Sequence, residues 1–244
     1  MGYVFLQCRD EMCRLRFPAP AAEANGLPCP RCRGETQEGG RGEGDVESAE
    51  KNEGLFSVSS APALRPPRPS LIALLDNIRS IHNVGSMFRT ADGAGVDHLH
   101  LLGITATPAH PRLAKAALGA HETIPWSYHR HGPDAAARLR DAGFQLWALE
   151  RTAEPSPQLS LYEAELPTGP LALIVGNERA GVDPELLALC DGVFALPMVG
   201  RKSSLNVAVA FGIAVYHLRY GRKRGGHGKK VALPASSSPC SPRS

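Results

Sequence analysis

One short polar segment combines groups that could bind a ligand at the start of a helix. Ser204 and Asn206 bracket Leu205 just before a long apolar run, so a hydroxyl and a carboxamide stand where helix amides lack partners. Leu196 and Met198 precede them, and apolar side chains in a loop suit a slot for a flat heterocycle. Helix capping alone would also explain the two polar residues, so both roles stay open at this point.

Two further segments carry polar residues beside glycine at the ends of apolar runs. Asn83 opens a helix with Arg89 in its second turn, and an arginine fork matches phosphate oxygens. Gly176 ends an apolar strand and could let a ligand approach the backbone, and Glu178 follows just beyond the strand end. Arg89 could instead be a solvated surface residue, and Glu178 could be a helix cap. The segment around Gly176 lacks both the dinucleotide-binding and the phosphate-loop glycine motifs.

Two close pairs of cysteines in the first 32 residues favour a metal site. The four are Cys8, Cys13, Cys29 and Cys32. Four thiolates so spaced suit tetrahedral zinc, and a metal would supply folding energy that so short a segment cannot obtain from a core. The alternatives are four reduced thiols or two disulfides, and a cytoplasmic setting disfavours disulfides.

Charge is distributed unevenly along a chain of ordinary composition. Hydrophobic residues make up 43% and charged residues 21%, as in soluble globular proteins. The net charge is +2 over residues 1–34 and +7 over 218–244, whereas the middle of the chain is acidic. Basic ends suit a polyanion such as RNA, although a basic tail can also serve solubility. No apolar run approaches the length of a membrane span and no signal-like segment opens the chain, so we expect a cytoplasmic protein without membrane contact.

Composition divides the chain into four parts. Residues 1–34 form the expected zinc-ribbon-like module, 35–69 a Gly-, Glu-, Ser- and Pro-rich disordered linker, and 222–244 a basic disordered tail. Residues 70–221 alternate short apolar runs with amphipathic segments, which predicts an α/β domain with a parallel sheet and helices on both faces. The expected strands are 71–75, 98–102, 145–149, 171–175 and 193–196, and the expected helices are 84–94 (with Asn83 as N-cap), 111–120, 134–142, 184–190 and 204–218.

Together, the three polar segments resemble the SpoU/TrmH-type RNA 2′-O-ribose methyltransferases of the SPOUT class. The chain carries Asn-x-Gly-x-x-x-Arg-x-Ala, then Gly-x-Glu-x-x-Gly, then Pro-Met-x-Gly followed by Ser-Leu-Asn-Val, in the family's order. The resemblance covers about residues 70–220. It implies a trefoil-knotted sheet domain, S-adenosylmethionine as the methyl donor, an RNA substrate and a homodimer with the site near its interface.

The resemblance also implies roles for single residues. Arg89 would assist the ribose hydroxyl, and we expect it to stabilise the forming alkoxide, since arginine almost never loses its proton; a direct base role stays open. The residues that would hold Arg89 and the ribose in register are Asn83, Glu178, Ser204 and Asn206. The residues that would bind S-adenosylmethionine are Gly176, Leu196, Met198 and Leu205. The arginines that would hold RNA phosphates around the zinc-like module are Arg14, Arg16, Arg31 and Arg33.

Three questions about function stay open at this level. The rival to an enzyme is a non-catalytic RNA-binding or assembly protein on the same fold. A base rather than a ribose could receive the methyl group, although the Ser-Leu-Asn step resembles the ribose-directed branch. The RNA could be rRNA or tRNA, and the added N-terminal module slightly favours rRNA by analogy.

Overall fold

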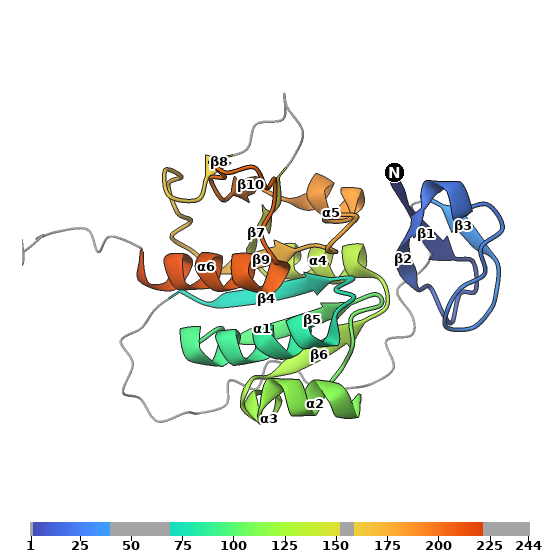
Figure 1. The fold of residues 1–244 in the computed structure, drawn as a ribbon, viewed down its shortest axis with the longest axis horizontal. Helices are drawn as coiled ribbons and strands as arrows, with labels where there is room; N and C mark the ends of the chain where they lie inside the picture. Colours follow the sequence, from blue (N-terminus) through green and yellow to red (C-terminus); the bar gives the residue numbers. More distant parts are fainter. Residues whose placement is uncertain (1, 40–68, 152–158, 222–244) are drawn as a thin grey trace, which may run out of the picture.

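The computed structural model describes residues 2–39, 69–151 and 159–221 of the chain. Most of the predicted linker and the whole predicted tail lie outside these described residues, so both predictions of disorder stay predictions. The described residues form a small sheet at the N-terminus beside a larger α/β unit (Figure 1). None of the described helices is long and apolar enough to cross a membrane.

Three antiparallel strands build the N-terminal module in the order β2-β1-β3. They are β1 (Tyr3–Cys8), β2 (Arg16–Pro20) and β3 (Thr36–Glu38), and a short 3-10 turn, η1 (Ala21–Glu23), follows β2. Leu6, Leu15 and Phe17 form a small core with three of the cysteines. Because β3 pairs with β1 beyond Gly34, the ordered module extends into residues that the sequence assigns to the linker. Glycine and charged residues around β3 hide this strand from prediction.

A seven-stranded sheet forms the middle of the larger unit, and its strands are parallel, as the sequence predicts. Its order is β6-β5-β4-β9-β7-β10-β8. The strands are β4 (Leu71–Asp76), β5 (His98–Leu102), β6 (Trp126–His129), β7 (Gln145–Leu149), β8 (Leu159–Ser160), β9 (Leu171–Val175) and β10 (Gly192–Ala195). The central strands β4 and β9 are buried throughout, whereas the edge strands β6 and β8 are short, less apolar and absent from the prediction.

Helices cover both faces of the sheet, as predicted (Figure 1). One face carries α1 (Ile81–Ala94), α2 (Pro111–Ala117), α3 (Ala120–Thr123) and α6 (Val207–Tyr220). The other face carries α4 (Gly132–Asp141) and α5 (Pro184–Leu189). α1 contacts both α2 and α6, so the first and last predicted polar segments lie on neighbouring helices.

The N-cap predicted for the first helix is wrong. α1 begins at Ile81, and Ser80 is its N-cap, because the Ser80 hydroxyl accepts a hydrogen bond from the amide of Asn83 at 3.3 Å. Asn83 therefore lies inside the first turn, and its carboxamide is free to make contacts elsewhere.

Two other predicted helices differ in their bounds. The segment 111–120 forms two helices, because Leu118 and Gly119 adopt left-handed backbone with φ of 48° and 87°. The final helix begins three residues later than predicted. Asn206 is its N-cap and accepts from the amides of Ala208 and Val209 at 2.9 and 3.4 Å. Asn206 thus has the capping role that the sequence leaves open as one of its two alternatives.

Gly85 permits the close packing of α1 on α2. A Cβ at this position would lie 2.5 Å from Cβ of Ala116 and 3.0 Å from the amide nitrogen of Ala117. We expect Gly85→Ala to lower the free energy of unfolding by about 1–3 kcal/mol through overpacking, measured by urea denaturation. The matched control is Gly212→Ala in α6, where the nearest atom, Cγ2 of Thr90, is 3.5 Å away. That variant should gain roughly 0.5–1 kcal/mol from helix propensity, and equal effects of the two substitutions would contradict the packing argument.

Candidate functional site

A hydrogen-bonded network joins one polar side chain from each of the three predicted segments. The Glu178 carboxylate accepts from Asn83 Nδ2 at 2.9 Å, and Asn83 Oδ1 accepts in turn from Asn206 Nδ2 at 3.1 Å. These three residues are called the Glu–Asn–Asn network below. Glu178 follows Asn83 by 95 positions and Asn206 follows Asn83 by 123, so the fold brings together side chains that are far apart in the sequence.

The Glu178 carboxylate ties two loops together. It accepts hydrogen bonds from the backbone amides of Arg79 and Ser80 at 3.0 and 3.1 Å, at the start of α1. Partial burial by itself would raise the pKa of Glu178, but these amides, its own amide and the Asn83 carboxamide outweigh burial and lower the pKa below its usual value. Glu178 is therefore an anionic acceptor at neutral pH, and it orients the side chain of Asn83.

The two loops follow the carboxyl ends of adjacent strands, β4 and β9, where ligands bind in parallel sheets. Gly176 allows a close approach there, but the approaching group is the chain itself. A Cβ on Gly176 would lie 2.2 Å from the amide nitrogen of Val182 and 2.3 Å from the carbonyl carbon of Gly181. The glycine is thus required by the turn after β9, and its predicted contact with a ligand stays a prediction.

Two of the four residues predicted to bind a methyl donor line one open pocket of about 240 Å³. Its walls are Leu196, Met198, Ala195, Pro197, Arg151 and Ser160. The Arg151 guanidinium donates to the carbonyl of Ser203 at 2.9 Å, which fastens the loop between β10 and α6 over this region. Leu205 is exposed and, like Gly176, lies outside the pocket walls. Leu196 and Met198 therefore share a pocket whose walls do not include Leu205, and the binding of a methyl donor there stays a prediction.

Arg89 lies apart from the Glu–Asn–Asn network within the single chain. It is exposed, and it lines a second pocket of about 430 Å³ with Asp92, Thr123 and the turn between α2 and α3. Neither Arg89 nor the exposed Ser204 has a side-chain hydrogen bond to any residue in the described part of the chain. The structure therefore brings together Asn83, Glu178 and Asn206, and it does not bring Arg89 or Ser204 to them.

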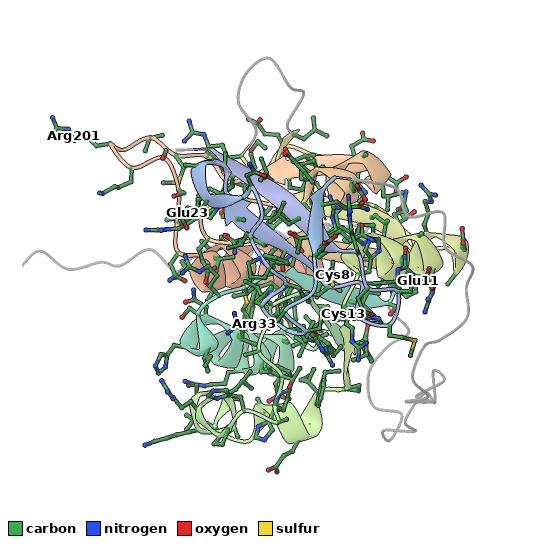
Figure 2. All side chains as sticks on the ribbon, turned by 90° about the vertical axis from the view of Figure 1, so that its right-hand side faces the viewer. Cys8, Glu11, Cys13, Glu23, Arg33 and Arg201 are labelled. Carbon is green, nitrogen blue, oxygen red and sulfur yellow. The ribbon has the colours of Figure 1, made fainter. Side chains whose placement is uncertain are left out.

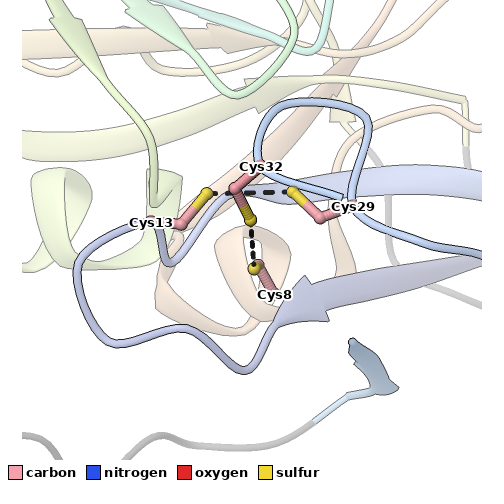
Figure 3. Close-up of side chains that lie close together, drawn as sticks. All are labelled: Cys8, Cys13, Cys29 and Cys32. Carbon is pink, nitrogen blue, oxygen red and sulfur yellow. Dashed lines mark hydrogen bonds between the residues drawn. The ribbon is translucent and has the colours of Figure 1, made fainter. Parts of the chain in front are cut away.

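The four N-terminal cysteines converge on one point (Figure 3). Their Sγ atoms all lie within 4.8 Å of one another, with Cys8 and Cys32 at 3.4 Å and Cys13 and Cys29 at 3.7 Å. Four sulfur ligands about 2.3 Å from a tetrahedral ion would lie about 3.8 Å apart, so the spacing fits a metal. The amide of Gly34 donates to Cys32 Sγ at 3.4 Å and lowers the pKa of that thiol.

One predicted RNA contact in this module is wrong. Arg16 is only 3% exposed and pairs with Asp183 of the larger unit at 2.5 and 3.0 Å, so it is unable to reach RNA. Arg201, by contrast, projects from the body of the domain at the tip of its loop, as Figure 2 shows. The pairing of Arg16 with Asp183 could not be predicted from the sequence, because the two residues are 167 positions apart and no local pattern connects them.

Comparison with known proteins connects these features to a family. The model of the SpoU rRNA Methylase family matches residues 70–216. The 23S rRNA (guanosine(2553)-2′-O)-methyltransferase RlmP of Bacillus subtilis is 35% identical over 71% of this chain and 68% of its own length. A tRNA (guanosine(18)-2′-O)-methyltransferase of Thermus thermophilus is 34% identical over 67% of this chain and 81% of its own length. The AdoMet complex of the SpoU methyltransferase AviRb from Streptomyces viridochromogenes has a TM-score of 0.56 at 28% identity, covering 64% of this chain and 62% of that one.

Proposed function

Because this chain belongs to the SpoU rRNA Methylase family, we infer that it is an enzyme that transfers a methyl group from S-adenosylmethionine to a ribose 2′-hydroxyl of structured RNA. The observation that carries this function is the Glu–Asn–Asn network, which joins all three family segments through two hydrogen bonds. A non-catalytic RNA-binding protein would have no need of this connected set of polar side chains at the carboxyl edge of the sheet.

The chain's own residues divide the work of methyl transfer. S-adenosylmethionine, when bound, supplies a methyl group that its sulfonium charge already activates. Leu196 and Met198 would hold it in the pocket after β10. The backbone near Gly176 and Leu205, which lie outside the walls of that pocket, would provide further contacts with it. The ribose hydroxyl is a weak nucleophile, so Arg89 stabilises the negative charge that develops on the ribose oxygen as the hydroxyl proton passes to water. Asn83, Glu178, Ser204 and Asn206 keep the ribose and Arg89 in register.

A homodimer completes the site in this proposal. Arg89 lies away from the Glu–Asn–Asn network in one chain, so a second copy is needed to supply an arginine to it. α6 offers a surface for that copy, because Val209, Tyr216 and Tyr220 are 46–64% exposed along one stripe of an apolar helix. α1 borders this stripe, and Tyr216 reaches it beside Gly93.

A trefoil knot is the proposed topology of the C-terminal half. It is supported by the position of β9, which lies between β4 and β7 in the sheet although both precede it in the chain. The chain then returns through β10 to α6, which packs back on α1 near the start of the domain.

The N-terminal module holds a structural zinc ion in this proposal. The proposal is supported by the four sulfur atoms, which lie within 4.8 Å of one another, a spacing compatible with tetrahedral zinc, and by the burial of three of the cysteines. The module's core is small, so bound metal supplies much of its stability. The cytoplasm, where thiols stay reduced, is the location consistent with such a site.

The proposed substrate is rRNA, with tRNA as the second candidate. The N-terminal module and the basic C-terminal residues add phosphate-binding charge to the domain, and the rRNA enzyme of Bacillus subtilis is a relative of comparable similarity to the tRNA enzyme. Mapping ribose methylations in cells with and without the protein tests this function. Loss of a single rRNA site, restored by the wild type but not by an Arg89→Ala variant, supports an rRNA enzyme. An unchanged methylation map, together with purified protein that fails to bind S-adenosylmethionine, would overturn the function.

The charge of Glu178 makes a testable contribution to stability. The pKa of Glu178 is lower in the folded chain than in the unfolded chain, so the carboxylate stabilises the fold above its unfolded pKa. This stabilisation is lost as pH falls through the folded pKa. We therefore expect Glu178→Gln to unfold at lower urea than the wild type at pH 7, with the gap closing as the solution is acidified below pH about 4. The control is Glu163→Gln, an exposed glutamate on the same domain, which should follow the wild type at every pH. A constant gap for Glu178→Gln would contradict the role of the charge.

A further inference from the structure

The N-terminal module packs against the larger unit, at the end of the sheet where the Glu–Asn–Asn network lies. The amide of Arg16 donates to the carbonyl of Arg130 at 3.2 Å, just after β6, and the Arg130 guanidinium donates to the carbonyl of Met12. Arg14 pairs with Asp134 of α4 at 3.0 Å. These contacts place the module at the carboxyl edge of the sheet, where the loops of the Glu–Asn–Asn network also lie.

The centre of this contact is a buried ion pair. Arg16 and Asp183 are 3% and 1% exposed, and two guanidinium nitrogens donate to the two carboxylate oxygens. Glu185 lies 3.2 Å from the same guanidinium and is partly exposed. A second buried carboxylate, Asp76, accepts from the amide of Asp183 at 2.9 Å. Burial, and then the nearby charge of Asp183, raise the pKa of Asp76 to about 7. Arg16 thus provides the main positive charge for two buried acids.

Further hydrogen bonds connect the Arg16–Asp183 pair to the two loops that follow β4 and β9. Asp76 accepts from Asn77 Nδ2 at 2.7 Å, and the carbonyl of Asn77 accepts from Asn177 Nδ2 at 2.7 Å. Asn177 in turn accepts from the amides of Arg179 and Ala180 at 2.9 and 3.0 Å. This chain fixes the loops on both sides of Glu178, whose carboxylate binds the amides at the start of α1.

We propose that Arg16 is a positioning residue for methyl transfer, because its pairing with Asp183 holds the 177–183 loop and thereby the Glu178 carboxylate. The inference rests on the proposed function of the site. It gives the N-terminal module a role beyond recruiting RNA: the module completes the support of the catalytic loops from outside the family domain. No other described residue offers a positive charge to Asp183 at hydrogen-bond distance.

The experiment uses the full-length protein with the substitution Arg16→Met. We expect kcat to fall on the order of 10- to 100-fold, because the loop that carries Glu178 shifts, while KM for RNA stays within about twofold. Amide hydrogen exchange of residues 176–183 should become faster. The matched control is Arg9→Met in the same module. Arg9 pairs with Glu35 at 3.3 Å on the surface, with both side chains more than half exposed, and its loss should change neither kcat nor exchange.

A second variant distinguishes loss of the ion pair from misfolding of the N-terminal module. Asp183→Asn breaks the pair from the other side and can still cap α5, so it should reproduce the kcat loss with the metal retained. The double variant should lose less than the product of the two single effects, because both substitutions break the same ion pair.

Several results would overturn the inference. Wild-type kcat in folded Arg16→Met and Asp183→Asn would show that the pair has no influence on the site. A rise in KM for RNA alone, with exchange of 176–183 unchanged, would make Arg16 an RNA-binding residue instead. If the wild type itself transfers no methyl group, the proposed function fails, and the exchange of 176–183 then decides alone whether Arg16 holds the loop.

Discussion

An Arg89→Ala variant is expected to lose methyl transfer by about 10²- to 10³-fold in kcat while its affinity for S-adenosylmethionine stays near that of the wild type. Removing one preorganised donor to a developing oxyanion has an effect of this size in other enzymes. The Arg89 side chain has no hydrogen bond within the described part of the single chain, so its removal leaves no buried partner unsatisfied, and the melting temperature should hardly change. Single-turnover methylation of the RNA substrate measures the effect.

The control for this variant is Arg140→Ala in α4. Arg140 is also an exposed helical arginine, but it lies on the opposite face of the sheet from α1, and its loss should leave kcat unchanged. Arg89→Lys separates charge from shape, since lysine keeps the charge but lacks the planar fork. Full activity in Arg89→Ala would remove the role assigned to this residue. Mixed dimers of Arg89→Ala with a Glu178→Gln subunit should regain activity at one of the two sites if the arginine comes from the partner copy.

Cys29→Ser is expected to abolish binding of the proposed zinc ion and to unfold the N-terminal module. Cys29 is fully buried, so the variant leaves a hydroxyl that binds zinc weakly in a core too small to persist alone. Structural zinc contributes about 10–16 kcal/mol of apparent binding energy in small zinc domains at neutral pH, which exceeds the stability of most domains this size. Metal content by mass spectrometry and hydrogen exchange of residues 3–20 measure the outcome.

Cys190→Ser serves as the matched control for the metal site. Cys190 lies after α5, and its thiol donates to the carbonyl of Leu186 at 3.2 Å, a contact that serine can also make. This variant should keep the metal and the folded module. A Cys29→Ser protein with the full metal content and slow exchange over 3–20 would mean that the four cysteines do not form a zinc site.

The parts of the fold that the sequence predicts well are those buried on both faces. The apolar runs 71–75 and 171–175 correspond to β4 and β9 almost residue for residue, because central parallel strands tolerate little polarity. The sequence does not predict the edge strands β6 and β8. Each pairs with a neighbouring strand on one side only, and its composition is mixed rather than apolar. The cap at Ser80 was hidden because Asn83, three residues later, has an equally good capping side chain.

The candidate site follows a similar division. The three segments could be recognised because each has local residue spacing, and one polar side chain of each meets the others in the Glu–Asn–Asn network. The sequence was unable to predict that Arg89 lies apart from them, since helical spacing says nothing of which neighbouring element closes a pocket. The pairing of Arg16 with Asp183 is also beyond local reasoning, because it depends on how two separately ordered sheets dock.

The position of β9 has a consequence for the synthesis of the chain. Strands β4 to β8 leave the ribosome before β9, so no strand fills the gap between β4 and β7, and two apolar edges stay open until residues 171–175 emerge. Parallel pairings between distant segments form slowly, and open strand edges invite pairing with other chains. The nascent protein is therefore most exposed to aggregation late in translation, at the moment when the last strands must enter a sheet that is already partly built.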